Sequence, residues 1–173
     1  IDYLVLDYLA EVTMSILQKQ RSRDPGAGYA RDFVTQMERI LPTIATNGVR
    51  VISNAGGVNP RACAAAVRAA ADKLGVGDKV KIALVTGDDL LDELDALTAA
   101  GEPFSNMDTG APLSDVRSQV RSANAYLGAD ALLPALQADA NVIITGRVAD
   151  PSLFVAPLMA HFGWSVDDWP RLG

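Results

Sequence analysis

The chain has 173 residues, of which 49% are hydrophobic and 21% are charged, and its formal net charge is −6. This length and hydrophobic share fit one globular domain with a sizeable core, and they exclude a disordered chain. The negative charge argues against binding to a nucleic acid or to an anionic membrane surface, because both are anionic themselves.

The sequence contains a single cysteine, Cys63, and a single histidine, His161. These counts exclude an internal disulfide and a cysteine-based metal cage. No apolar run is long enough to span a membrane, and no signal-peptide pattern is visible. No redox-cofactor fingerprint is present. We therefore expect a cytoplasmic protein without a cofactor or a resident metal.

Apolar runs, helical spacing of apolar residues and turn formers divide the chain into alternating elements. The predicted elements, in chain order, are a strand at 3–6, helices at 9–23 and 30–46, a strand at 49–53, a helix at 60–74, a strand at 79–86, a helix at 88–100, a long loop at 101–118 over the sheet edge, a strand at 120–127, a helix at 129–138, a strand at 141–145 and a helix at 152–162.

This alternation predicts an α/β fold for a single domain over residues 1–173. We expect a mostly parallel open sheet with helices on both faces, doubly wound and Rossmann-like. The chain opens inside an apolar run without an initiating Met and ends without a closing element, which suggests a fragment of a longer chain. In such folds ligands bind at the carboxyl edge of the sheet, so the loops that follow the strands are the candidate site.

The loop after the second strand is the first candidate. Gly56 and Gly57 allow a close approach of the backbone, and Asn59 is a good N-cap for the helix that follows. The N-terminus of that helix, with Asn54 and Arg61, suits an anionic group. The alternative is an ordinary turn from strand to helix.

A second candidate follows the last strand, where Arg147 could bind an anion or keep Asp150 ionised. The alternative is a structural ion pair. At the same edge Asp7 ends the first strand, and Glu11, one helical turn further, is interpreted as a solvated residue. Asp88 and its neighbour Asp89 could bind a ribose or a hard cation, but we favour a role as helix N-cap.

Two further candidates lie between residues 101 and 127. Asn106 and Asp108 belong to a polar stretch of the long loop, where Asp108 could act as a general base or as a turn former. Asn124 and Tyr126 would face one side of the strand predicted there, because side chains alternate with period two. Asn124 could then position a carbonyl and Tyr126 could donate a proton.

The order of these motifs resembles the acyclic terpene utilisation (AtuA) family over essentially the whole chain. The motifs are Asp7-Tyr8-Leu9-Ala10-Glu11, Tyr29-Ala30-Arg31-Asp32-Phe33, Asn54-Ala55-Gly56-Gly57 with Asn59-Pro60-Arg61, Gly87-Asp88-Asp89-Leu90, Asn106-Met107-Asp108-Thr109-Gly110, Ser122-Ala123-Asn124-Ala125-Tyr126-Leu127-Gly128, Thr145-Gly146-Arg147-Val148-Ala149-Asp150, Phe162-Gly163-Trp164 and Asp167-Asp168-Trp169. The resemblance implies terpene or branched-acid breakdown, acyl-CoA substrates and a small companion protein, in a family whose members are longer at both ends.

We therefore expect an enzyme of acyl-CoA or organic-acid catabolism that performs a lyase, hydratase or isomerase step on a small anionic substrate. The expected substrate-binding residues are Asn54, Gly56, Gly57, Asn59, Arg61, Asn106, Asn124 and Arg147, and the expected catalytic residues are Asp108, Asp150, Asp7 and Tyr126. One alternative is a non-catalytic ligand-binding or scaffold subunit that works as a homo-oligomer or with a companion protein. Another is metal-assisted chemistry through Asp88, Asp89 and Asp108.

Overall fold

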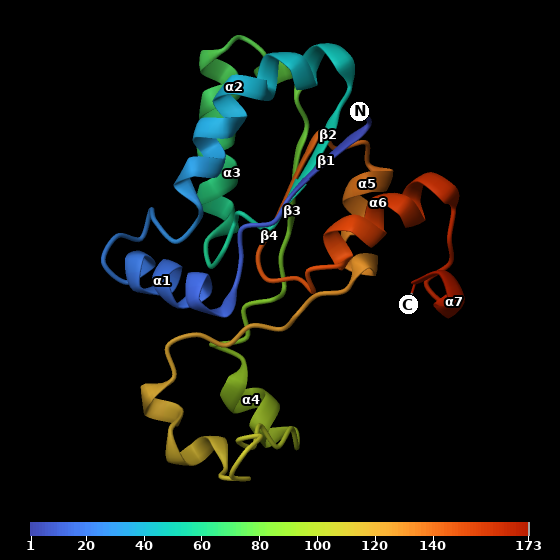
Figure 1. Ribbon diagram of the computed structural model, residues 1–173. Coiled ribbons are helices and arrows are strands. Elements are labelled where there is room, and N and C mark those ends of the chain that lie inside the picture. The colour runs from blue at the N-terminus through green and yellow to red at the C-terminus, as the bar shows by residue number, and fades with distance from the viewer. Residues whose placement is uncertain (173) are drawn as a thin grey trace.

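The computed structural model describes residues 1–172. Its centre is a parallel sheet in the order β1-β2-β4-β3 (Figure 1). The strands are β1 (Tyr3–Leu6), β2 (Arg50–Ser53), β3 (Ile82–Val85) and β4 (Val142–Thr145). The predicted α/β fold with an open parallel sheet is confirmed. The two central strands β2 and β4 are almost fully buried, as the apolar residues at their centres, Val51-Ile52 and Val142-Ile143-Ile144, indicate.

Helices cover both faces of the sheet (Figure 1). The helices α2 (Arg31–Asn47) and α3 (Pro60–Lys73) lie on one face, and α5 (Leu133–Gln137) and α6 (Ser152–Phe162) lie on the other. Each pair forms a separate apolar core with the sheet. Burial on both faces is the arrangement that a parallel sheet requires.

Helix α2 shows how the sequence pattern produces this packing. Its residues Phe33, Met37, Leu41 and Ile44 recur at helical spacing and are all buried against the sheet and α3. The helix ends at Gly48, which has a φ of 68° and so adopts the left-handed conformation that favours glycine.

The helices after the two central strands run to opposite faces of the sheet. After β2 the chain enters α3 on one face, whereas after β4 it enters α6 on the other. Parallel connections are right-handed, so a reversal of direction along the sheet changes the face that the helix covers. The carboxyl ends of β2 and β4 therefore form the topological switch point, where open α/β sheets usually bind ligands.

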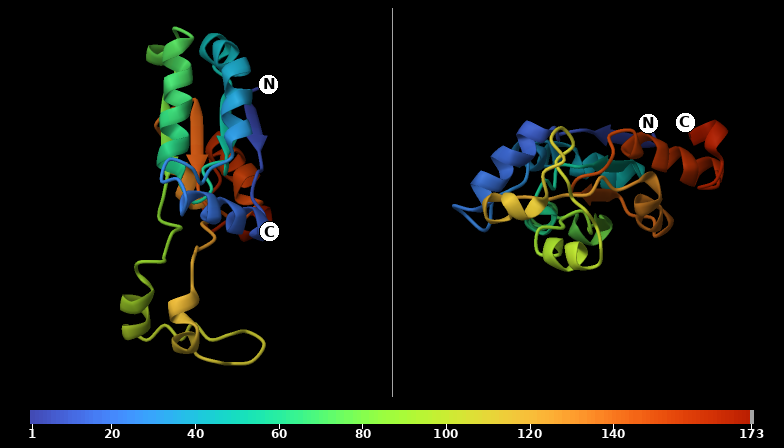
Figure 2. Two further views of the ribbon diagram at one scale, coloured as in Figure 1. Left: turned by 90° about the vertical axis from the view of Figure 1, so that its left-hand side faces the viewer. Right: turned by 90° about the horizontal axis from the view of Figure 1, so that it is seen from below.

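Helix α1 (Glu11–Arg21) lies across the carboxyl edge of the sheet rather than on a face (Figures 1 and 2). Three apolar residues fix it there: Leu9, Met14 and Leu17 form a small buried cluster with Val58 of the loop after β2. This packing brings the polar N-terminal end of α1 close to the loops that follow the strands.

Residues 90–122 form a lobe that projects beyond the carboxyl edge of the sheet (Figures 1 and 2). The lobe contains α4 (Leu94–Ala99) and two 3₁₀ turns, Leu113–Asp115 and Arg117–Gln119. Residues 101–118 are mostly irregular, as predicted, but they project away from the sheet edge and do not lie over it. Leu94 is the single buried hydrophobic residue of this segment, so the lobe has too little apolar surface to pack onto the body.

Two predicted elements beside the lobe are also wrong. The helix expected at 88–100 begins only at Leu94, because Asp88 turns inward to the sheet edge. The strand expected at 120–127 is an extended segment outside the sheet, with isolated bridges from Asn124 to Asp89 and from Leu127 to Val148. Apolar content alone does not distinguish a sheet strand from an extended crossing segment.

The remaining elements are the 3₁₀ turns Gly77–Lys79 and Ala129–Leu132 and the short helix α7 (Trp169–Leu172). Within residues 1–172, none of the helices combines the length and the apolar character needed to cross a bilayer.

Candidate functional site

The first strand and the second strand are joined at their carboxyl ends by Asn54. Its side-chain oxygen accepts a hydrogen bond from the Tyr8 N–H at 2.7 Å, and its Nδ2 donates to Asp7 Oδ1 at 2.7 Å. Asn54 is completely buried, and Asp7 is exposed. The side chain of Asn54 therefore aligns the loop that carries Asp7, and both of its polar atoms have partners within the protein.

The loop after β2 is packed tightly at the switch point. A Cβ on Gly56 would overlap the carbonyl oxygen of Thr145 on β4, and one on Gly57 would overlap Leu17 of α1. These two glycines therefore allow protein segments to approach each other. The space between the ends of β2 and β4 is filled, which moves any ligand outward from the switch point.

Three N–H groups of this loop, those of residues 57–59, are engaged within the protein as well. Gly57 donates to the Asn54 carbonyl, Val58 to the Gly28 carbonyl and Asn59 to the Gly56 carbonyl. The predicted N-cap role of Asn59 is confirmed: its side chain accepts from the Ala62 N–H at 3.3 Å. Its Nδ2 also donates to two carbonyls of the 25–27 turn. Anion binding here stays a prediction that would require these contacts to open.

Asp88 lies buried at the carboxyl edge, between β3 and β4. Its Oδ2 accepts hydrogen bonds from the Arg147 N–H at 2.7 Å and from Asn124 Nδ2 at 3.0 Å. A Cβ on Gly146 would come within 2.6 Å of its carboxyl carbon, so the glycine creates the space for this carboxyl group. Burial raises the pKa of Asp88 above its ordinary value, and the two hydrogen bonds only partly oppose that rise.

Arg147 is the centre of the site. Its side chain is only 4% exposed, and its guanidinium donates to the Leu9 carbonyl at 3.0 Å and to Glu11 Oε1 at 3.2 Å. The guanidinium also lies 3.5 Å from Asp150 Oδ1 and 4.2 Å from the centre of the Tyr126 ring. Arg147 thus meets two carboxylates and an aromatic face at one point.

Glu11 is the accessible carboxylate beside Arg147. Its side chain is 77% exposed, and its Oε1 accepts a hydrogen bond from the Tyr126 hydroxyl at 2.6 Å. That hydrogen bond, with help from the positive charge of Arg147, lowers the pKa of Glu11 below its ordinary value. We call Glu11, Asp88, Asn124, Tyr126 and Arg147 the Arg147 cluster.

The pKa of Asp88 predicts how stability depends on pH. Burial raises its folded-state pKa, so its stabilising contribution is complete below the unfolded pKa of about 3.9 and is lost as the pH rises through the folded pKa. Asp88→Asn removes this titration. The free energy of unfolding of the wild type should therefore fall relative to that of Asp88→Asn between pH 4 and pH 7, measured by urea unfolding. Asp78→Asn, a change at an exposed carboxylate, is the control; an equal pH dependence in both variants would contradict the prediction.

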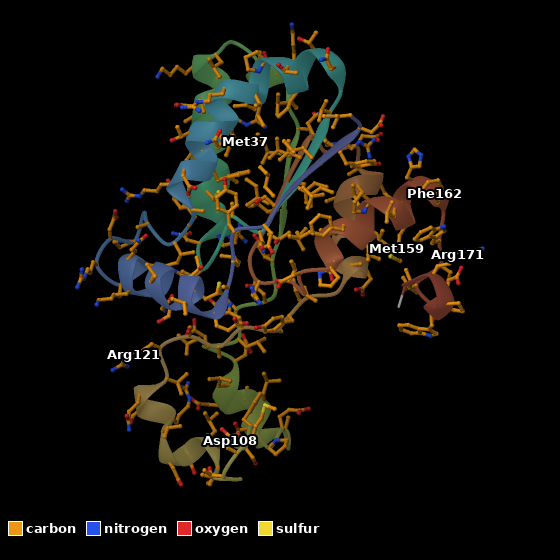
Figure 3. All side chains as sticks on the ribbon, viewed as in Figure 1. Met37, Asp108, Arg121, Met159, Phe162 and Arg171 are labelled. Carbon is orange, nitrogen blue, oxygen red and sulfur yellow. The ribbon has the colours of Figure 1, made fainter. Side chains whose placement is uncertain are left out.

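Several predicted residues lie outside the cluster. Asn106 and Asp108 belong to an exposed turn of the lobe, where Asn106 Oδ1 accepts from the Asp108 N–H at 2.9 Å, and Figure 3 shows Asp108 far from the sheet edge. Arg61 is exposed on the first turn of α3 and makes no ion pair within residues 1–172. The structure does not bring these three residues to Arg147.

Two residues of the cluster were not among the predicted site residues. Asp88 does not cap a helix, because its carboxyl group turns inward, and Glu11 contacts both Tyr126 and Arg147. The position of Asp88 in the turn after the strand predicted at 79–86 is the signal that could have revealed it. The only sequence signal for Glu11 is its position one helical turn after Asp7.

The single cysteine and the single histidine lie away from this edge. Cys63 is buried in the core beneath α2, and burial raises the pKa of its thiol to about 12, as expected of an inert residue. His161 is on α6 beside Tyr3, with ring centroids 6.4 Å apart. In the described part of the chain, no group of three or more His, Cys, Asp or Glu side chains could hold a metal ion.

The fold and the cluster define an open α/β protein with a charged site at the carboxyl edge of its parallel sheet. The model of the family described as "Acyclic terpene utilisation family protein AtuA" matches residues 1–173. The chain therefore belongs to the AtuA family, which implies a role in acyclic terpene utilisation. Neither a curated protein nor a solved structure matches the chain.

Proposed function

We propose that the protein is an enzyme of acyl-CoA or organic-acid catabolism that performs a proton-transfer step of the lyase, hydratase or isomerase type. One observation carries the proposal: two carboxyl groups of the Arg147 cluster have pKa values shifted in opposite directions. The pKa of Asp88 is raised by burial, and that of Glu11 is lowered chiefly by the Tyr126 hydroxyl. The two carboxyl groups both contact Arg147, Asp88 through the backbone N–H of that residue and Glu11 through its guanidinium. Titratable groups whose environments push their pKa values apart are typical of acid–base sites.

Within the Arg147 cluster, Glu11 and Tyr126 are the two groups that a substrate can touch, because both are exposed. Ionised Glu11 would accept a proton from the carbon next to a thioester or carboxyl carbonyl. Tyr126 would donate its proton to the departing or newly formed oxygen. Arg147 and Asp88 lie behind them and hold them in position, so we assign these two a positioning role.

The two other predicted acids at this edge, Asp150 and Asp7, are alternative bases in this proposal. Asp150 lies 3.5 Å from Arg147, and Asp7 is held by Asn54, so each is an alternative base at the same edge. Arg147 already faces Glu11 and Asp150, and its charge is therefore balanced within the protein. The anionic group of the substrate therefore needs another cation. Arg61 is the one predicted from the sequence, but it is exposed on α3 outside the Arg147 cluster.

Hydrogen–deuterium exchange at the substrate tests the proposal. The chain is incubated in D₂O with branched and carboxylated acyl-CoA thioesters, and loss of the proton next to the carbonyl is followed by NMR. We expect exchange with at least one thioester, and Glu11→Gln should slow it about 100-fold or more, the usual worth of a general base. Glu38→Gln, on the exposed face of α2, is the matched control. Equal exchange in wild type and Glu11→Gln would rule out this assignment.

A non-catalytic subunit is the second candidate, and one observation favours it. The exposed residues Phe154, Leu158 and Phe162 of α6 line an apolar cavity of about 360 Å³ beside Tyr3 of the edge strand β1. Apolar surface of this kind often marks a contact with another chain. If no thioester exchanges but one binds in a thermal-shift assay, this second candidate is supported instead.

A further inference from the structure

A polar cavity of about 370 Å³ lies between α1 and the segment that returns from the lobe. Its lining consists of two cations, three hydroxyl groups and one amide: Lys19, Arg121, Ser15, Ser22, Ser122 and Gln18. No carboxylate lines it, although the whole chain carries a net charge of −6. The cavity is therefore a local positive site on an otherwise negative protein.

The cavity continues the Arg147 cluster along one side of α1. Ser15, Gln18, Lys19 and Ser22 follow Glu11 at helical spacing, on one side of the helix. The facing segment runs antiparallel to α1, because the Tyr126 hydroxyl donates to Glu11 at 2.6 Å and Gln18 Nε2 donates to the Arg121 carbonyl at 2.6 Å. At 1.5 Å per residue, the cavity extends roughly 6–17 Å from Glu11 along the helix.

The two cations of the cavity have no acidic partner. Lys19 and Arg121 form no ion pair within residues 1–172. One Arg121 nitrogen donates to the Ser118 carbonyl at 3.3 Å, which leaves the rest of the guanidinium available. Figure 3 shows Arg121 where the lobe meets the body. Ser22 donates its proton to the Lys19 carbonyl, and its oxygen remains exposed near the cavity.

We infer that this cavity binds a phosphate group of the ligand, while the acyl end of that ligand lies at the Arg147 cluster. Two unpaired cations supply the charge, and the hydroxyl groups of Ser15 and Ser122 supply one donor from each wall, which suits a tetrahedral anion with several acceptor oxygens. The inference rests on the proposed function, because it makes the substrate a phosphate-bearing thioester such as an acyl-CoA rather than a free acid.

Calorimetric titration of the chain with inorganic pyrophosphate and with free CoA tests the inference. Both probes should bind at low ionic strength, and binding should weaken with added salt. Lys19→Gln and Arg121→Gln should each weaken binding of both probes about tenfold. Lys73→Gln removes an exposed cation at the far end of α3 and is the matched control, with unchanged affinity expected.

Two results would overturn the inference: no binding of pyrophosphate or CoA by the wild type, or equal binding by the wild type and both cavity variants. A Tyr126→Phe variant tests the two proposals separately, because Tyr126 belongs to the Arg147 cluster and does not line the cavity. This variant should slow thioester exchange and leave the affinity for pyrophosphate unchanged. If thioester exchange depends on Glu11 while CoA affinity is independent of Lys19 and Arg121, the inference fails and the proposed function stands. If pyrophosphate binding requires both cations but no thioester shows exchange, the phosphate site stands and the proposed function fails.

Discussion

Gly56→Ala is expected to lower the free energy of unfolding by about 3 kcal/mol, at the upper end for overpacking of a core. The added methyl group would overlap the carbonyl oxygen of Thr145 and lie 2.7 Å from the Cβ of Pro60. A backbone carbonyl at the end of a central strand cannot move alone, so β4 or the start of α3 must shift. Urea denaturation measures the loss.

Gly75→Ala is the control for this prediction. Gly75 has a φ of 69° and open space around its Cα, so alanine there suffers only the cost of the left-handed conformation, about 1 kcal/mol. A loss at Gly56 no larger than that at Gly75 would mean that the contact with Thr145 relaxes easily. The switch point would then have room for a ligand, contrary to the tight packing described above.

Gly146→Ala is expected to displace the Asp88 carboxyl group and to destabilise the protein by about 2 kcal/mol. A Cβ at residue 146 would lie 2.5 Å from Asp88 Oδ1 and 2.6 Å from its carboxyl carbon. The carboxyl group would have to leave its hydrogen bonds with Asn124 and with the Arg147 N–H. Thioester exchange should fall as well, because this carboxyl group supports the position of Arg147.

A double-mutant cycle tests the stated cause. Asp88→Ala removes the carboxyl group with which the new methyl group collides, so Gly146→Ala should cost less than about 1 kcal/mol in that background, measured by urea unfolding. A cost that is the same in both backgrounds would show that the methyl group collides with something other than Asp88. The cycle is informative even though Asp88→Ala is itself destabilising, because only the difference between backgrounds is interpreted.

The sheet and its covering helices could be predicted because their signals are local. Short β-branched apolar runs mark the centres of β2 and β4, and helical spacing of apolar residues marks the buried side of α2. The region from 88 to 127 could not be predicted in the same way. Its short apolar runs suit a helix or a strand equally. The inward turn of Asp88 delays the helix until Leu94, and residues 120–127 stay outside the sheet.

The site was predicted in part, for a related reason. Arg147 and Asp150 follow a predicted strand, and Asn124 and Tyr126 lie on one side of another predicted strand. The structure brings all four together, although the second strand does not form. Their partners depend on long-range packing that no local pattern encodes. The Tyr126 hydroxyl and Glu11, for example, meet across 115 residues of sequence.

The two ends of the lobe meet beside the body, where the Leu90 N–H donates to the Ala123 carbonyl and the Ala125 N–H donates to the Asp88 carbonyl. The polypeptide between these points is therefore an appendage on a closed neck, and loop-closure entropy depends only weakly on the number of residues it contains. Insertions or deletions in the lobe are therefore expected to be tolerated without disturbing the Arg147 cluster below it. The architecture thus separates a rigid sheet edge that holds the charged cluster from an appendage whose length and sequence can vary.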